Sequence, residues 1–141
     1  MSGKTSSAAV EYRETGVGPT VVFAPGSCCT GAAWRPVVAH LNDARAITTS
    51  LSAYGGTAQR RTSADRSITP VAEALEEVLV QAGGQVHLVG HSFGGRVLLA
   101  VALRRVVPLL SLTIFEAPAP SVLTAVTEAA HLAAFRALTD A

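Results

Sequence analysis

The ten residues VHLVGHSFGG, at positions 86–95, decide the fold of this chain of 141 residues. An apolar, β-prone run leads into the pattern Gly-x-Ser-x-Gly at Gly90, Ser92 and Gly94, and apolar residues then recur at helical intervals. Where a strand turns sharply into a helix at a serine, such glycines keep Cβ atoms out of the crowded turn. The stretch therefore predicts a nucleophile elbow at 90–95, with Ser92 exposed at the carboxyl edge of a parallel sheet.

The segments on either side make this motif more specific than its spacing alone. A bare Gly-x-Ser-x-Gly pattern is expected by chance in roughly one chain in twenty of this length. Here a β-prone segment bounded by Gly83 and Gly84 comes directly before the motif, and a helical pattern comes directly after it. A glycine-rich turn that joins a strand to a helix without any chemistry is the alternative interpretation.

Strand-like and helix-like patterns alternate along the rest of the chain. Strands are expected at 9–14, 20–24, 45–51, 85–89 and 111–115. Helices are expected from 31 onward, from 69 to 82, after the elbow, and over 122–138. This alternation predicts a three-layer α/β/α fold, in which helices cover both faces of a mostly parallel sheet.

Two of the expected helices carry further signals. The first shows the i, i+3, i+4, i+7 spacing of a helix packed on a sheet, at Trp34, Val37, Val38 and Leu41. The second is expected to have Thr69 as its N-cap and Pro70 as its first helical residue. Gly83 and Gly84 are expected to end it.

The composition is typical of a soluble globular chain. Hydrophobic residues make up 49% of it, charged residues 15%, and the formal net charge is +1. No basic patch or basic helix is visible, which argues against nucleic acid or a membrane as the main partner. No apolar run has the length of a signal-peptide core or a membrane span, so a cytoplasmic location is expected. The adjacent Cys28 and Cys29 imply neither a disulfide framework nor a metal site.

Five short motifs, taken in order, resemble those of the α/β-hydrolase superfamily. They are VVFAPGS at 21–27, AWRP at 33–36, YGGT at 54–57, GHSFGG at 90–95 and FEAP at 115–118. Their combination is more specific than the elbow alone, and it resembles the serine-esterase and non-haem-peroxidase-like branch. The resemblance covers the N-terminal portion of that fold and implies truncation after the sixth strand and the first cap helix.

The resemblance also implies roles for single residues. Ser92 would be the nucleophile, the backbone N–H groups of Ser27 and Phe93 would form the oxyanion hole, and the pocket would include Pro25, Gly26 and His91. Such donors and a base are needed because a serine hydroxyl is a poor nucleophile near neutral pH. No cofactor is implied. Pro25 departs from the family, which commonly has histidine there, and this puts the loop geometry in question.

The catalytic base and acid are less evident than the nucleophile. The family places its histidine after an eighth strand, and the histidines of this chain suggest other roles: a solvated His40, a sheet residue His87, an unreactive inward-pointing His91, and His131 in the expected cap. Glu116 stands where some relatives carry the acid, at the end of the sixth strand. The alternative for Glu116 is a strand-end carboxylate bonded to backbone or lying at the pocket edge.

The expected domain organisation is a hydrolase core at 1–120 and the start of an incomplete cap at 121–141. The chain would then be a fragment or a natural truncation. Its strand at 111–115 would form an uncovered apolar sheet edge, which predicts self-association through that edge.

Two functions of different class follow from these observations. The first is a serine hydrolase that acts on a carboxylic ester or a similar small acyl substrate through Ser92 and an acyl-enzyme, inactive in this truncated form. The second is a non-catalytic hydrolase remnant, or a binding or assembly module, that lacks the catalytic histidine. Haloperoxidase-like chemistry or carbon–carbon bond hydrolysis is a variant of the first.

Overall fold

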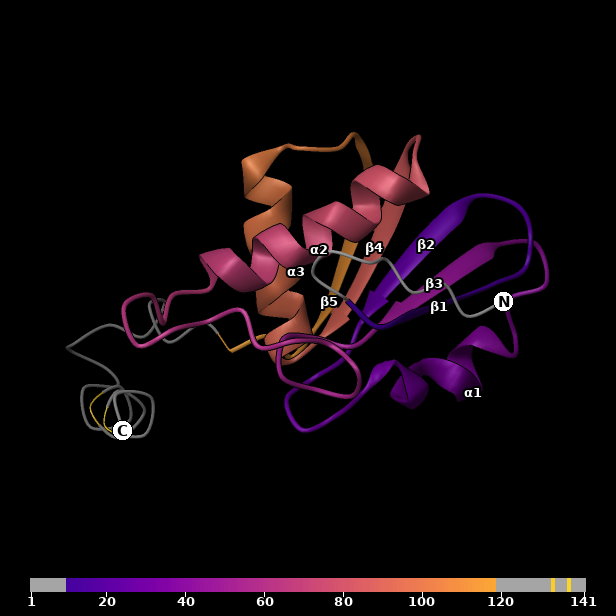
Figure 1. Ribbon diagram of the computed structural model, residues 1–141. Helices are drawn as coiled ribbons and strands as arrows, with labels where there is room; N and C mark the ends of the chain where they lie inside the picture. The colour runs from indigo at the N-terminus through magenta and orange to yellow at the C-terminus, as the bar shows by residue number, and fades with distance from the viewer. Residues whose placement is uncertain (1–9, 119–132, 134–136, 138–141) are drawn as a thin grey trace.

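The computed structural model describes residues 10–118, 133 and 137 of the chain. Its centre is a five-stranded sheet in the order β1-β3-β2-β4-β5 (Figure 1). The strands are β1 Tyr12–Thr15, β2 Thr20–Ala24, β3 Arg45–Thr49, β4 Val86–His91 and β5 Leu109–Phe115. All neighbours run parallel except β1, which pairs antiparallel with β3. The predicted mostly parallel sheet is therefore confirmed.

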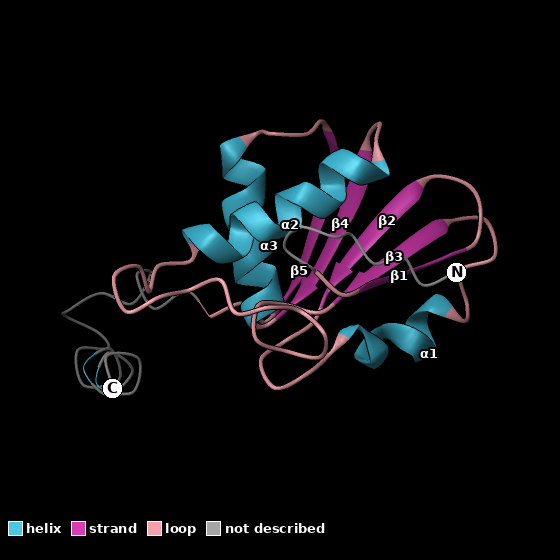
Figure 2. Ribbon diagram, in the orientation of Figure 1, coloured by secondary structure: helices cyan, strands magenta, loops and turns pink. Residues whose placement is uncertain are grey.

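Helices lie on both faces of this sheet, as Figure 2 shows. The helices α2 (Thr69–Ala82) and α3 (Phe93–Arg104) lie together on one face. The other face carries a 3-10 turn, η1 (Gly31–Trp34), that continues into the short helix α1 (Arg35–Val38). The predicted three-layer α/β/α arrangement is confirmed for this part of the chain.

Alternation along the strands divides the apolar core into two clusters, because successive side chains of a strand point to opposite faces. In β2, Val22 and Ala24 face the larger cluster, under α2 and α3, whereas Phe23 faces the smaller one with Trp34 and Ala46. The rings of Phe23 and Trp34 have centroids 5.1 Å apart at an interplanar angle of 45°. The indole therefore anchors η1 to the sheet.

The first helix is much shorter than its apolar spacing predicts. Instead of one helix with a continuous stripe, the chain makes a 3-10 turn and a single α-helical turn. Val37 and Leu41 are 46% and 37% exposed. Trp34 lies in the 3-10 turn, where residues repeat every three positions, so the 3.6-residue stripe is broken at its start. The prediction of a full amphipathic helix here is wrong.

Two of the predicted strands begin or end a few residues from the expected positions in the structure. The strand expected at 45–51 ends at Thr49, because Ser50 turns to loop partners: its Oγ accepts from the N–H of Gly31 and its carbonyl oxygen from the Thr57 hydroxyl. The strand expected at 9–14 is β1, whose end at Thr15 pairs with Ala46.

The start of α2 is displaced by one residue from the expected position. The carbonyl oxygen of Ile68 accepts the N–H groups of Val71 and Ala72, so Ile68 is the N-cap and Thr69 is already helical. Gly83, with φ 72°, ends the helix as predicted. The helix expected over 122–138 and the cap at 121–141 lie outside the described residues, apart from two isolated positions.

The path of the chain through the sheet favours a binding site at the carboxyl ends of β2 and β4. From β2 the chain crosses one face through α1 to reach β3, and then crosses the other face through α2 to reach β4 on the opposite side of β2. The segments that follow β2 and β4 therefore leave toward opposite faces. In parallel α/β sheets, ligands bind at the carboxyl ends of strands where the connections diverge in this way. In the described residues, no helix is long and apolar enough to cross a membrane.

Candidate active site

Ser92 stands at the junction between β4 and α3 in a backbone conformation that L-residues rarely adopt. Its φ is 51° and its ψ is −122°. The Ser92 N–H donates to the carbonyl oxygen of Phe115 on β5 at 2.8 Å, which ties the turn to the neighbouring strand. Its side chain makes no capping hydrogen bond to α3. The hydroxyl is therefore not used to begin the helix, and the predicted sharp turn at 90–95 is present.

The glycines of the motif permit the contacts that hold this turn. A Cβ on Gly90 would lie 2.6 Å from the Cα of Gly95. A Cβ on Gly94 would meet the carbonyl oxygens of Ala24 and Pro25 at the end of β2. The first turn of α3 is thus pressed against both β4 and β2, and such packing can keep a residue in an unfavourable conformation.

The segment after β2 lies directly against the elbow. Pro25 and Gly26 are buried, and Ser27 is exposed. A Cβ on Gly26 would lie 2.9 Å from Nδ1 of His91 and 3.3 Å from the Cβ of Ser92. A turn closed by the Cys29 N–H and the Gly26 carbonyl oxygen, at 3.3 Å, follows. Although Pro25 replaces a histidine common in the family, the loop still meets the elbow.

Phe93 is the first residue of α3, so its N–H belongs to the helix end that lacks intrahelical acceptors. Such N–H groups, aligned with the helix dipole, favour negative charge nearby. The structure therefore brings five predicted site residues to one place, around the elbow and the segment that faces it: Pro25, Gly26, His91, Ser92 and Phe93.

His91 and Glu116 lie near each other, on either side of the elbow. His91 Nε2 is 3.9 Å from Glu116 Oε2, and their side chains are 47% and 89% exposed. His91 is therefore open to solvent, and the expectation that it points into the structure is wrong. Glu116 has φ 50° at the end of β5. Its carboxylate reaches toward His91, and no hydrogen bond to backbone is found for it among the described residues.

The other histidines are placed as follows. His87 lies on β4, and its Nδ1 is 2.8 Å from the hydroxyl of Ser111 on β5, which fits the expected role in the sheet. His40 is exposed just beyond α1, and His131 lies outside the described residues. Within residues 10–118, no hydrogen bond joins a histidine to Ser92.

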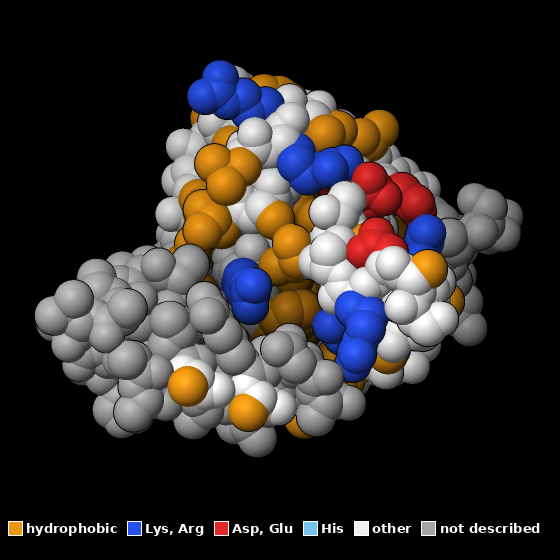
Figure 3. All heavy atoms as spheres, turned by 90° about the vertical axis from the view of Figure 1, so that its left-hand side faces the viewer, with side chains coloured by type: hydrophobic (Ala, Val, Ile, Leu, Met, Phe, Trp, Pro, Cys, Tyr) orange, Lys and Arg blue, Asp and Glu red, His pale blue; other side chains and the backbone are white. Residues whose placement is uncertain are grey.

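Basic side chains are prominent on one face of the molecule. Figure 3 shows this face, on which arginine side chains stand around an exposed apolar area. Among the described residues, no group of three or more His, Cys, Asp or Glu is arranged to hold a metal ion. Cys28 and Cys29 are free and exposed.

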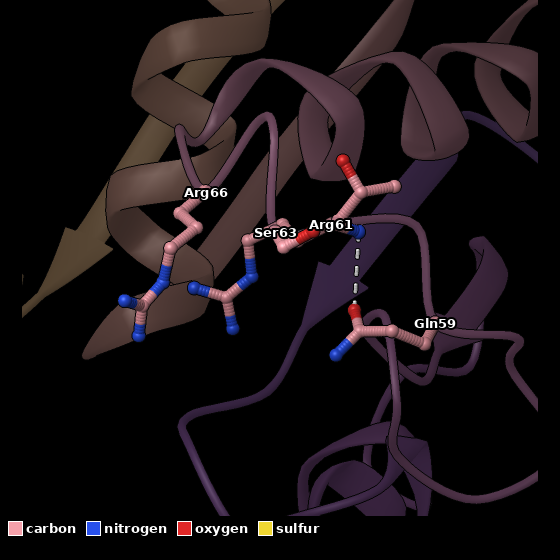
Figure 4. A pocket seen from close by; sticks show the side chains of 5 residues that line it. Gln59, Arg61, Ser63 and Arg66 are labelled. Carbon is pink, nitrogen blue, oxygen red and sulfur yellow. Dashed lines mark hydrogen bonds between the residues drawn. The ribbon is translucent and has the colours of Figure 1, made fainter. Parts of the chain in front are cut away.

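A pocket that the sequence did not indicate lies in the segment between β3 and α2. It has a volume of about 430 Å³ and is lined by Gln59, Arg61, Thr62, Ser63 and Arg66 (Figure 4). The guanidinium carbon of Arg61 is 5.7 Å from the centroid of the Phe93 ring, which places Arg61 beside the elbow. The sequence showed only a polar loop here. The closely spaced arginines were the one available signal.

Comparisons with known proteins agree with this geometry. A model of the alpha/beta hydrolase family matches residues 21–141. A comparison with curated proteins finds no match. The chain belongs to the alpha/beta hydrolase family.

Solved structures with a similar fold include an alpha/beta hydrolase from Sphaerobacter thermophilus, with a TM-score of 0.70, 23% identity, and coverage of 82% of this chain and 44% of that one. An esterase from Exiguobacterium antarcticum has a TM-score of 0.72 and 24% identity, and the match covers 84% of this chain and 45% of the esterase. An epoxide hydrolase variant from Vigna radiata has a TM-score of 0.74 and 19% identity, and the match covers 97% of this chain and 43% of the epoxide hydrolase. This chain thus spans less than half the length of these proteins.

Proposed function

We propose that the chain carries the nucleophile half of a serine hydrolase that acts on a carboxylic ester or a similar small acyl substrate. The backbone of Ser92, with φ 51° and ψ −122° between β4 and α3, is the observation that carries this proposal. That turn presents a hydroxyl at the carboxyl edge of the sheet and leaves it unused by the helix. Ser92 would attack the carbonyl carbon, and water would then hydrolyse the acyl-enzyme.

The type of nucleophile favours an ester over an epoxide, although structural neighbours include both esterases and epoxide hydrolases. Attack of a serine hydroxyl on an ester gives an acyl-enzyme, whose carbonyl carbon water can attack in turn. Attack on an epoxide would instead leave an ether on Ser92, with no carbonyl carbon for water to attack. Turnover through Ser92 therefore requires an acyl substrate.

The oxyanion formed during this attack needs donors that are already in place. In this proposal the backbone N–H of Phe93, at the start of α3, is one donor, and the N–H of Ser27 is the other. A single donor of this kind contributes about 3–4 kcal/mol to the transition state in serine hydrolases. The packing of Gly94 against the end of β2 supports the proposal, because it keeps the two segments together.

A binding or assembly module without catalysis is the second candidate. It is favoured by the absence, within residues 10–118, of a histidine bonded to Ser92. His91 and Glu116, 3.9 Å apart, pair a histidine with a carboxylate in that range. Among the described residues, this pair makes no hydrogen bond to the serine hydroxyl.

Covalent labelling of the full chain separates these two candidates. The chain is treated with a fluorophosphonate, and the modified residue is located by mass spectrometry. We expect the label on Ser92, and we expect Ser92→Ala to remove it. The matched control is Ser111→Ala. Ser111 contacts His87 near the start of β4, whereas the elbow follows the end of that strand. That variant should label at the original rate.

Hydrolysis of p-nitrophenyl acetate and butyrate by the same samples, with size-exclusion chromatography, completes the test. Turnover that is lost in Ser92→Ala supports the hydrolase. A folded sample that neither labels nor turns over would favour the binding module instead.

A further inference from the structure

The pocket between β3 and α2 has an unusual charge balance. Two of the five side chains that line it are arginines, and none is acidic. In Figure 4 the guanidinium groups of Arg61 and Arg66 extend in the same direction from the loop. The arginines that form ion pairs in the described residues are others, namely Arg45, Arg60 and Arg104. The pocket therefore presents two positive charges that an anion can satisfy.

The acid closest in sequence does not neutralise these charges. Asp65 lies in the same loop, and its Oδ1 accepts the backbone N–H of Ser67 at 2.9 Å. Hydrogen bonds from the Ser67 side chain and backbone hold the pKa of Asp65 below its usual value. Its carboxylate is thus directed to Ser67 and is not among the side chains that line the pocket.

The loop is held in shape by its own hydrogen bonds. The buried Ser52 donates its hydroxyl to Oε1 of Gln59 at 2.8 Å and accepts the N–H of Arg60 at 2.7 Å. Oε1 of Gln59 also accepts the N–H of Arg61 at 3.1 Å, the dashed line in Figure 4. A loop that is already ordered loses less conformational entropy when it binds a ligand.

A second turn, between Thr62 and Asp65, orders the later part of the loop that forms the pocket. The Thr62 N–H donates to the Asp65 carbonyl oxygen at 2.9 Å, and the Asp65 N–H donates to the Thr62 hydroxyl at 3.0 Å. This reciprocal pair sets the spacing between Arg61 and Arg66, which flank it in the sequence. The amide nitrogen of Gln59 is available as a further neutral donor.

Arg61 connects this pocket to the reaction site. Its guanidinium lies over the ring of Phe93, 5.7 Å from the centroid, and Phe93 follows Ser92 directly. Among the described residues, no hydrogen bond or ion pair uses the Arg61 guanidinium, so its N–H groups can donate to a carboxylate in bidentate fashion. A substrate whose ester lies at Ser92 and whose anionic end lies in the pocket would meet both sites.

We propose that Arg61 and Arg66 form a carboxylate-binding subsite, so that the substrate is an ester that also carries a free carboxylate. This inference rests on the proposed function, because it names the substrate class of the same site. The planar carboxylate matches the fork of an arginine, and the two arginines together balance its charge.

Binding is measured without chemistry, so that it can fail or succeed independently of Ser92. The full chain carrying Ser92→Ala is titrated with monomethyl glutarate, and backbone amides are followed by nuclear magnetic resonance. Dimethyl glutarate, which differs by one methyl group and carries no charge, is the matched probe. We expect the acid to shift the amides of residues 59–66 and of Phe93, and the diester to leave them in place.

Variants of the two arginines test their roles. Arg61→Gln and Arg66→Gln should each weaken binding of monomethyl glutarate by about ten-fold, the effect of losing a charge-assisted pair of hydrogen bonds. Lysine at the same positions should weaken it less, since the charge remains and only the fork is lost. Arg105→Gln is the control, because Arg105 caps the opposite end of α3 from the elbow. It should bind like the parent.

The outcomes separate this inference from the proposed function. Equal shifts with the diester, or unchanged binding in both glutamine variants, would overturn the subsite even if Ser92 labels. Tighter binding of inorganic phosphate than of monomethyl glutarate would overturn the carboxylate assignment. Arginine-dependent binding by a chain whose Ser92 does not label would support the subsite and count against the hydrolase.

Discussion

At the residue scale, the backbone of Ser92 matters more than its position in a motif. A non-glycine residue at φ 51° and ψ −122° is strained, and the cost of such conformations is of order 1–3 kcal/mol. The contacts of Gly90, Gly94 and Gly95 with their surroundings supply the packing that holds it. Strain of this kind clusters at functional sites in proteins, which supports the role proposed for Ser92.

The strain can be measured by comparing two substitutions of Ser92. We expect the free energy of unfolding of Ser92→Gly to be roughly 1 kcal/mol higher than that of Ser92→Ala, because glycine has no Cβ to oppose a positive φ. At most other positions alanine is the more stabilising of the two. Denaturant unfolding of both variants gives the difference, and an alanine variant that is equally or more stable would show that the turn is unstrained.

Gly94 tests the contact between the elbow and the end of β2. We expect Gly94→Ala to lower the free energy of unfolding by about 1–3 kcal/mol, because the new Cβ would press on the carbonyl oxygens of Ala24 and Pro25. Fluorophosphonate labelling should slow as the two segments move apart. Gly56→Ala is the control, since the atoms nearest to its Cβ would be those of Glu11, at an ordinary 3.5 Å. A Gly94→Ala variant as stable as this control would contradict the contact.

At the scale of the elements, Arg45 joins three of them. Its Nε and Nη2 donate to the two carboxylate oxygens of Glu14 at 2.6 and 3.1 Å, which links β3 to β1. Its Nη1 donates to the carbonyl oxygen of Ala82 at 2.8 Å, near the end of α2. One side chain thus ties an edge strand and a helix end to the sheet.

This arrangement predicts a pH dependence of stability. The hydrogen bonds from Arg45 hold the pKa of Glu14 below its usual value, so the pair stabilises the fold above the ordinary pKa of glutamate and loses that contribution as pH falls through the lowered pKa. Because both side chains are partly exposed, we expect Glu14→Gln to cost less than about 1 kcal/mol near pH 7. The difference from the parent chain should vanish on acidification.

Unfolding curves at several pH values measure this effect. The double variant Glu14→Gln with Arg45→Gln completes the cycle, and its loss should be smaller than the sum of the two single losses. A Glu14→Gln deficit that stays constant down to about pH 2 would contradict an origin in the ionised carboxylate.

At the scale of the whole molecule, β5 is one of the two edge strands of the sheet in the described part of the chain. No strand of the described part of the chain lies beyond β5, and Leu110 and Phe115 on it are 49% and 50% exposed. An apolar strand edge with free backbone groups favours pairing with another strand.

We therefore expect the 141-residue chain to associate with itself through β5 at micromolar to millimolar concentration. Leu110→Lys should shift it toward the monomer, because a charge on an edge strand opposes pairing. Val80→Lys is the control, since Val80 is 60% exposed on α2, away from that edge. Light scattering after size exclusion measures both. Equal association of the two variants would rule out the β5 edge as the interface.

The sequence by itself determined the features that depend on short-range patterns. Alternation and helical spacing predicted the mostly parallel sheet and its covering helices, and the spacing of Gly90, Ser92 and Gly94 predicted the elbow. These patterns can be recognised in the sequence because neighbouring residues suffice to specify them. The direction of successive side chains repeats with a fixed period in strands and helices, and glycine has no Cβ to obstruct a tight turn.

Only the tertiary structure decided the features that join distant segments. The short first helix depends on how Trp34 packs against Phe23, and the pair of Glu14 and Arg45 spans 31 residues of sequence. The position of Arg61 over Phe93, which places one wall of the basic pocket beside the elbow, follows from how the loop after β3 folds back over the sheet edge. No local period encodes such contacts, because they form only when separate strands bring their ends to the same edge.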